Sequence, residues 1–311
     1  MSESMLTLSS SPHIRSNNTV QKIMRDVLIA LTPAALAGIY FFGMDAALVI
    51  AVAMGSSALT EYIWQKCTHQ KITVSDLSAL VTGLLIALNV PSTLPLWMVA
   101  LGSIFAIIVV KQFFGGVGQN IVNPALAGRA FLLACWPTFM TTWTLNGATT
   151  ATPLALLKTG APLTSSLKDV FLGNVGGCIG EVSALALLIG AAYLLYKKVI
   201  SYHIPVYYIG TVALLTYVIG RNGMFTGNAL YEIFCGGLMI GAFFMATDYT
   251  TCPMTKKGQI IFAIGCGVLT SIIRLVGSGY PEGVSYSILI MNLVVPLIDK
   301  FVTPKKFGEV K

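Results

Sequence analysis

Long apolar segments, separated by short polar turns, recur along the whole of this 311-residue chain. A helix that crosses a bilayer needs roughly 17 to 25 mostly apolar residues, and Pro, Gly, Asn and charged residues mark where such segments end. The pattern predicts about ten transmembrane helices, near residues 24–43, 45–64, 76–91, 95–112, 123–140, 177–197, 203–220, 230–248, 258–276 and 284–302. The expected fold class is therefore an all-α integral membrane protein.

Composition favours the same class. Hydrophobic residues make up 55% of the chain and charged residues 10%, whereas about 25% of residues are charged in a soluble domain. The net charge of +7 comes from Lys and Arg spread over short loops, not from the clustered basic face that nucleic-acid binding needs. The six cysteines form no C-x-x-C pair, so their spacing gives no support for a metal site. We expect contact with membrane lipid and no nucleic-acid partner.

The basic residues predict the orientation of the chain, because cytoplasmic loops carry the excess of Lys and Arg. With the N-terminus inside, fifteen of the 19 basic residues fall on the inner side and four on the outer side. The inner set is Arg15, Lys22, Arg25, Lys66, Lys71, Lys111, Arg129, Lys197, Lys198, Lys256, Lys257, Lys300, Lys305, Lys306 and Lys311. The outer set is Lys158, Lys168, Arg221 and Arg274. The N- and C-termini are thus predicted to be cytoplasmic, and the long loop 141–176 extracytoplasmic.

A faint internal repeat divides the helices into two halves. Val81–Pro95 resembles Leu238–Pro253, since each is an apolar helix that ends in a loop with Thr and Pro. The two copies would cross the membrane in opposite directions, which is an inverted-topology repeat that builds sites from interrupted helices; the alternative is chance similarity. The expected divisions are a cytoplasmic segment 1–22, a first five-helix repeat 23–140, the loop 141–176, a second five-helix repeat 177–302 and a cytoplasmic tail 303–311.

The segment 113–132 combines a Gly-rich turn with polar residues in an apolar context. The N–H groups of such a turn, followed by Pro at a helix start, favour anion binding, and buried Asn and Arg are often functional in membranes. The candidate binding residues are Gly116, Gly118, Asn120, Asn123 and Arg129. The alternative is a tight turn that caps a membrane helix, with Arg129 extended to the cytoplasmic surface.

Three threonines stand among small residues at 146–154 in the outer loop. Small neighbours let a bulky group approach a hydroxyl, which suits a modification site. Thr-rich loops are also common without modification, so the residues alone leave both interpretations open.

Four segments carry a resemblance to a known family that covers nearly the whole chain. They are PSTLPLW at 91–97, GGVGQNIVNPALAGRAFL at 115–132, TATPL at 150–154 and GYPEGVSYSILIMN at 279–292. On these segments the chain resembles the D subunits of Rnf-type ferredoxin:NAD+ oxidoreductases and, more distantly, the B subunits of sodium-translocating NADH:quinone reductases.

The resemblance implies a covalent flavin. In that family a separate flavin transferase attaches flavin mononucleotide (FMN) through its phosphate to a threonine in a small-x-Ala-Thr motif outside the membrane. The match is Thr150-Ala151-Thr152, so Thr152 is the expected attachment site, and Thr149 is the second candidate because it also follows an alanine. Relatives stack a second flavin within the membrane, which implies a non-covalent riboflavin as a further cofactor.

The resemblance also implies a cation path. Asp76 opens the third predicted helix where the reductase relatives carry an acidic residue for sodium uptake, and oxygen ligands suit hard cations. The alternative is an acid that complements the helix dipole. Glu61, Glu181, Glu232 and Asp248 lie at or near predicted helix ends, where interfacial positions or pairs with basic neighbours are expected.

Together these expectations describe one subunit of a redox-driven translocase, catalytically incomplete alone, in a bacterial or archaeal cytoplasmic (inner) membrane. It would move electrons between ferredoxin and NAD+ and drive Na+ or H+ transport. No G-x-G-x-x-G opens a strand-to-helix unit, so partner subunits, including a second membrane-anchored flavoprotein, would handle those substrates. The rival is a solute channel or transporter, since inverted repeats with broken helices describe those too.

Overall fold

The computed structural model describes residues 19–145, 148–160, 165–220, 224–276 and 282–303. Within them, four helices are long and apolar enough to cross a membrane. These are α1 (Val20–Phe42), α2 (Met44–Cys67), α13 (Lys256–Leu275) and α14 (Val284–Phe301). Shorter apolar helices are α3 (Ser78–Leu88), α4 (Leu96–Phe105) with its π-helical continuation η2 (Ala106–Gln112), α5 (Pro124–Cys135), α9 (Ala184–Tyr196) and α10 (His203–Val218). The chain is an all-α multi-pass membrane protein.

The remaining elements are short. They are η1 (Val74–Asp76), α6 (Pro137–Met140), α7 (Pro153–Thr159), α8 (Leu167–Leu172), α11 (Ala229–Phe234), α12 (Leu238–Ile240), η3 (Gly241–Met245), and the antiparallel strands β1 (Thr144–Leu145) and β2 (Ala148–Thr149). Ser166 caps α8, and its hydrogen bonds lower the pKa of the Asp169 carboxyl. Most of the predicted tails 1–22 and 303–311 lies outside the described residues.

The ends of two short helical segments meet inside the protein. With 11 residues, α3 rises about 16 Å, roughly half of a bilayer's hydrocarbon core, and α12 with η3 spans only 238–245. Their ends meet, since Nδ2 of Asn89 at the end of α3 lies 3.7 Å from Sδ of Met245 in η3. These helices fall in the two segments that the sequence pairs as a repeat.

Buried ion pairs occupy corresponding places in the two halves. Glu61 near the end of α2 pairs with Lys111 of η2 at 2.8 Å, and Glu232 of α11 pairs with Arg274 of α13 at 3.3 Å. In each half the acid precedes the interrupted helix and the base follows it. This correspondence supports the predicted repeat. The exact boundaries of the repeat stay a prediction.

The predicted helix at 230–248 is broken in the structure into α11, α12 and η3. Gly236 adopts a left-handed φ of 71° between α11 and α12, which glycine tolerates without strain. The N–H of Gly237 then donates to Glu282 Oε1 at 3.1 Å instead of continuing a helix. A side chain from a distant segment therefore satisfies the backbone where the helix stops.

Two further predicted helices are shortened. The segment 177–197 becomes helical only from α9, because the residues before it pack against the end of α3: the N–H of Gly180 donates to the carbonyl of Leu88 at 2.8 Å. Pro137 divides the segment 123–140 into α5 and α6. Apolar length alone does not detect these interruptions.

Three basic residues that the sequence assigns to the inner or the outer side of the membrane are buried in the structure. Lys111, Arg129 and Arg274 are 3%, 2% and 0% exposed, and each is paired with a carboxylate. The alternative in which Arg129 reaches the cytoplasmic surface is therefore wrong. Removing Lys111 and Arg129 from the fifteen inner residues and Arg274 from the four outer ones leaves thirteen against three, so the asymmetry persists.

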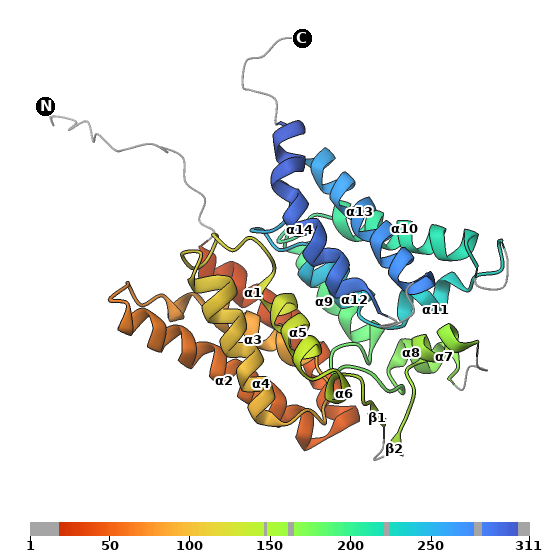
Figure 1. Cartoon of the computed structure of the whole chain (residues 1–311), viewed down its shortest axis with the longest axis horizontal. Helices are drawn as coiled ribbons and strands as arrows, with labels where there is room; N and C mark the ends of the chain where they lie inside the picture. The colour runs from red at the N-terminus through yellow and green to blue at the C-terminus, as the bar shows by residue number, and fades with distance from the viewer. Residues whose placement is uncertain (1–18, 146–147, 161–164, 221–223, 277–281, 304–311) are drawn as a thin grey trace, which may run out of the picture.

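Figure 1 shows the first half, α1 to α5, beside α10, α13 and α14 of the second half. The start of α1 and the end of α14 lie at one end of the bundle, while β1, β2, α7 and α8 lie at the other end. The hairpin of β1 and β2 and the segment that leads from it into α7, together called the hairpin loop, thus lie opposite the two ends of the described chain. Which side faces the cytoplasm stays a prediction.

Close packing of α1 against α9 generates a test of the fold. A Cβ at Gly190 of α9 would overlap the carbonyl oxygen of Ala30, whereas a Cβ at Gly210 of α10 would meet open space. We predict that Gly190→Ala lowers the free energy of unfolding by about 1–3 kcal/mol through overpacking, and that Gly210→Ala does not lower it. Thermal unfolding of the purified chain in detergent measures both, and equal effects would contradict the contact.

Candidate functional site

A cavity of about 610 Å³ opens beside the hairpin loop that carries the predicted modification motif. The volume lies within the roughly 300–1,000 Å³ of typical ligand sites. Its walls come from the hairpin loop, the segment before α9, the end of α11 and the start of α14. Residues around it include Trp143, Thr152, Glu181, Phe234, Glu282 and Tyr286.

The two candidate threonines differ in their relation to this cavity. Thr152 lines it and caps α7, where its Oγ1 accepts a hydrogen bond from Ala155 N at 3.2 Å. Pro153 occupies the first helical position and fixes this turn. Thr149 lies in β2, is exposed and does not line the cavity. Of the two candidates, Thr152 is therefore the one that lines this cavity.

Thr150, between them, presents a buried polar atom to the same wall. Its Oγ1 has no hydrogen-bond partner among the described residues, and an unsatisfied buried hydroxyl costs about 1–3 kcal/mol. A Cβ at Gly176 would collide with this hydroxyl, so a glycine is needed opposite it. The Thr150 hydroxyl therefore lies within the wall, against Gly176, and not on the surface of the cavity.

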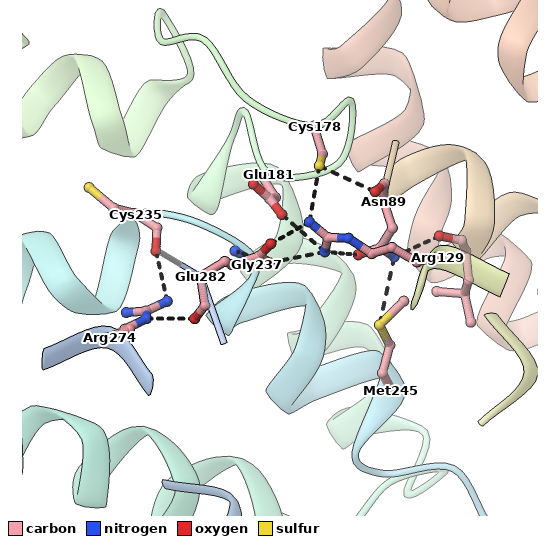
Figure 2. A network of polar contacts seen from close by, with 10 residues as sticks. Asn89, Arg129, Cys178, Glu181, Cys235, Gly237, Met245, Arg274 and Glu282 are labelled. Atoms are coloured by element: carbon pink, nitrogen blue, oxygen red, sulfur yellow. Dashed lines mark hydrogen bonds and ion pairs between the residues drawn. The ribbon is translucent and has the colours of Figure 1, made fainter. Parts of the chain in front are cut away.

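The inner wall of the cavity is charged. Figure 2 shows the guanidinium of Arg129 surrounded by Asn89, Cys178, Glu181 and Glu282. Its Nη1 donates to Glu282 Oε1 at 3.0 Å and to Asn89 Oδ1 at 3.1 Å, and lies 3.5 Å from Glu181 Oε1. Its Nη2 pairs with Glu282 Oε2 and contacts Cys178 Sγ at 3.5 Å. Glu181 and Glu282 also line the cavity. Arg129 therefore holds two side chains of the cavity wall in place.

A second arginine holds the backbone of the cavity wall. Arg274 Nε donates to the carbonyl of Glu282 at 3.0 Å, and its Nη2 donates to the carbonyl of Cys235 at 3.3 Å. Its Nη1 also binds Glu232, through both the carbonyl and the side chain. Arg274 is fully buried, so its role here is to fix two lining residues in place.

The Gly-rich turn forms a different site. Gly116 and Gly118 have φ of 97° and 89°, which favour glycine. Gly118, Asn120 and Asn123 line a separate cavity of about 100 Å³, and Gly116 does not. Asn123 caps α5, where its Oδ1 accepts from Ala125 N at 3.0 Å. Of the predicted binding residues, the structure therefore separates Gly118, Asn120 and Asn123 from Thr152, whereas Arg129 lies beside the cavity that Thr152 lines.

Asp76 belongs to a third polar group. Its Oδ1 accepts from Ser78 N at 2.8 Å and from Ser78 Oγ at 2.6 Å, so its carboxylate lies beside the first residue of α3, as expected of an acid that complements the helix dipole. Ser78 Oγ in turn accepts from Lys111 Nζ at 2.7 Å, and Lys111 pairs with Glu61. Gln112 Nε2 also donates to Glu61, at 3.0 Å. A continuous row of polar contacts thus runs from Asp76 to a fully buried carboxylate.

Several central residues were not singled out from the sequence. Glu282 and Asn292 stand in the segment 279–292 and Asn89 in the segment 81–95, where polar residues interrupt apolar sequence. Asn292 accepts from Asn123 N at 3.1 Å and so links the halves. A polar side chain buried within a membrane requires a polar partner. Polar residues that interrupt these apolar segments were therefore the signal that could have identified them. Of the four acids expected to lie at interfaces or to pair with bases, Glu61, Glu181 and Glu232 pair with bases, whereas Asp248 accepts from Thr251 Oγ1.

These features define an all-α membrane protein in which interrupted helices from two halves surround buried ion pairs and a cofactor-sized cavity. The chain belongs to the NQR2, RnfD, RnfE family, which it matches over residues 7–308.

Similar proteins extend over the whole chain. It is 51% identical, over 100% of its own length and 98% of the relative's, to the D subunit of the Na(+)-translocating ferredoxin:NAD(+) oxidoreductase complex of Acetobacterium woodii. It is 50% identical to the D subunit of the proton-translocating ferredoxin:NAD(+) oxidoreductase complex of Clostridium ljungdahlii, over 98% and 97% of the two chains. Identity to the D subunit of the ion-translocating oxidoreductase complex of Shewanella amazonensis is 34%, over 97% and 98%. The family resemblance is confirmed.

The buried pair Glu61–Lys111 generates a stability test. We predict that Lys111→Met lowers the free energy of unfolding by about 3–5 kcal/mol, because it leaves a buried carboxylate without its cation. The double variant Glu61→Gln/Lys111→Met should recover most of this loss, since no buried charge remains. Unfolding of the three proteins in detergent measures the recovery. A double variant as unstable as Lys111→Met would contradict the pairing.

Proposed function

We propose that this chain is the membrane subunit of an ion-translocating ferredoxin:NAD+ oxidoreductase complex and carries FMN bound covalently at Thr152. The observation that carries the proposal is the position of the Thr150-Ala151-Thr152 motif on the wall of a 610 Å³ cavity. The similar proteins that are named as D subunits of such complexes cover the whole chain and support the same role.

The residues around the cavity fit a flavin. Trp143, Phe234 and Tyr286 offer aromatic surface for a flat ring system, and Thr152 places its hydroxyl where a phosphate ester would tether the cofactor. The carboxylates of Glu181 and Glu282 provide polar contacts. Bound FMN would supply one-electron transfer chemistry.

The protein would supply position and electrostatics. Arg129 and Arg274 hold Glu282 through its side chain and its carbonyl respectively, so the charges of the inner wall are fixed before any electron arrives. Preorganised charge in a water-poor site acts more strongly than charge in water. The pairing of Arg129 with Glu181 and Glu282 would thus set the local field that a flavin experiences.

The proposed activity couples electron transfer to Na+ or H+ transport. Asp76, Ser78, Lys111 and Glu61 form the polar row that enters the interior beside α3, and we propose it as part of a cation path. The relatives named for sodium and for protons are 51% and 50% identical to this chain. Overall similarity to these relatives therefore supports transport of a monovalent cation and does not distinguish Na+ from H+.

The complex would contain further subunits, including a second membrane-anchored flavoprotein, which bind ferredoxin and NAD+. A flavin transferase outside the cytoplasmic membrane would load Thr152, with both termini in the cytoplasm. A second, non-covalent riboflavin stays a prediction without a location. The cavity around Gly118, Asn120 and Asn123, at about 100 Å³, is smaller than the roughly 300 Å³ minimum of typical ligand sites.

Covalent attachment has a direct test. The full chain is expressed with a flavin transferase, as wild type, Thr152→Val and Thr149→Val, and flavin fluorescence is read after denaturing electrophoresis. We predict a fluorescent band in wild type and Thr149→Val and none in Thr152→Val, because the ester needs the Thr152 hydroxyl.

If the band is lost only in Thr149→Val, the attachment site is Thr149. That result would contradict the proposal that the attached flavin lies in the cavity beside Thr152. If wild type shows no band while the same host labels a known flavinylated protein, the redox proposal is wrong. The solute transporter would then be the better interpretation of the interrupted helices.

A further inference from the structure

A basic pocket lies between the start of α1 and the end of α9, away from the proposed flavin site. It has a volume of about 260 Å³, and its polar lining residues are Lys22, Arg25, Asp26, Lys197, Lys198 and Tyr249. Four cations and one carboxylate give these residues a formal charge of +3, against +7 for the whole chain. Much of the chain's excess charge is therefore concentrated here.

Local contacts hold this pocket in shape. Tyr193 donates to Asp26 Oδ1 at 3.0 Å, which ties α9 to α1, and Lys197 Nζ lies 5.8 Å from the centroid of the Tyr193 ring. Lys198 takes a left-handed φ of 55°, which is uncommon for a lysine. The hydroxyl of Tyr249 binds the carbonyl of Val199 and closes the far side.

The helix dipoles stabilise only two of the four basic residues that line the pocket. Lys197 and Lys198 follow the C-terminus of α9, where a cation is stabilised. Lys22 and Arg25 stand near the N-terminus of α1, where the dipole disfavours cations, and Asp26 is the one carboxylate among the residues that line the pocket. An anion bound between the two helices would stabilise all four cations.

Apolar surface continues directly from this pocket along both helices. On α1, Ile29 and Leu36 follow Arg25 at helical spacing and are 46% and 60% exposed. On α9, Ile189 is 55% exposed and lies seven residues before Tyr196, beside Lys197. A cationic head site above an exposed apolar face matches the shape of a phospholipid.

We propose that this pocket binds the phosphate headgroup of an anionic phospholipid, whose acyl chains lie against the exposed faces of α1 and α9. Basic pockets between membrane helices bind such headgroups. Under the predicted orientation the lipid belongs to the cytoplasmic leaflet. The proposal does not depend on the flavin.

Native mass spectrometry of the full chain in detergent, with added phosphatidylglycerol, tests the proposal. The pocket variants are Lys22→Gln/Arg25→Gln and Lys197→Gln/Lys198→Gln. The matched control is Lys256→Gln/Lys257→Gln, which removes two cations from the first turn of α13 outside the pocket. Each basic residue near a membrane surface contributes about 1 kcal/mol, so each pocket variant should bind roughly tenfold to thirtyfold more weakly, and the control should bind like wild type.

Two further arms identify the source of the phosphate. Phosphatidylcholine should bind more weakly than phosphatidylglycerol, and glycerol 1-phosphate at the same concentration should not displace the lipid. Equal losses in pocket and control variants would overturn the proposal, because the binding would then follow total charge. Displacement by glycerol 1-phosphate would overturn it in favour of a soluble phosphate ligand.

Discussion

The burial of the Arg129 guanidinium is the constraint on which the arrangement depends. In an apolar interior a charged group must be paired, and losing one partner of a buried pair costs about 3–5 kcal/mol. Arg129 on α5 draws Asn89 from the end of α3, Glu181 from the segment before α9 and Glu282 from the segment before α14 into one cluster. One side chain therefore fixes where the interrupted helix of the first half meets the second half.

The larger cavity follows from this cluster. Glu181 and Glu282 are held by Arg129 on one side and form the cavity wall on the other, while Arg274 fixes the carbonyls of Cys235 and Glu282. The hairpin loop brings Thr152 to the same space from outside the bundle. Gly176 and Gly237 let side chains approach the backbone closely, because a Cβ would overlap Thr150 Oγ1 at the first position and Glu282 Oε1 at the second. A tethered cofactor would thus lie against a set of charges that the protein holds in fixed positions.

Much of this could be predicted from sequence, for identifiable reasons. Apolar length indicated the membrane fold, because it is a local pattern, and the family resemblance indicated Thr152 as the candidate attachment site, which stays a prediction. The breaks at Gly236 and before α9 could not be predicted, since a distant acceptor satisfies the backbone there: Glu282 for Gly237 and Leu88 for Gly180. For the same reason the burial of Lys111 and Arg274 could not be predicted, because their carboxylate partners lie 50 and 42 residues away along the chain.

The claim that Thr152 holds its flavin inside the cavity is tested most directly by iodide quenching of the attached flavin's fluorescence, in the folded chain and after unfolding. A typical pocket buries about 70–90% of a ligand's surface, so the quenching constant should be roughly fivefold lower in the folded chain. Free FMN measured in the same two solutions corrects for viscosity and denaturant. A quenching constant that does not change on unfolding would mean that the flavin lies in solvent, and would contradict the account.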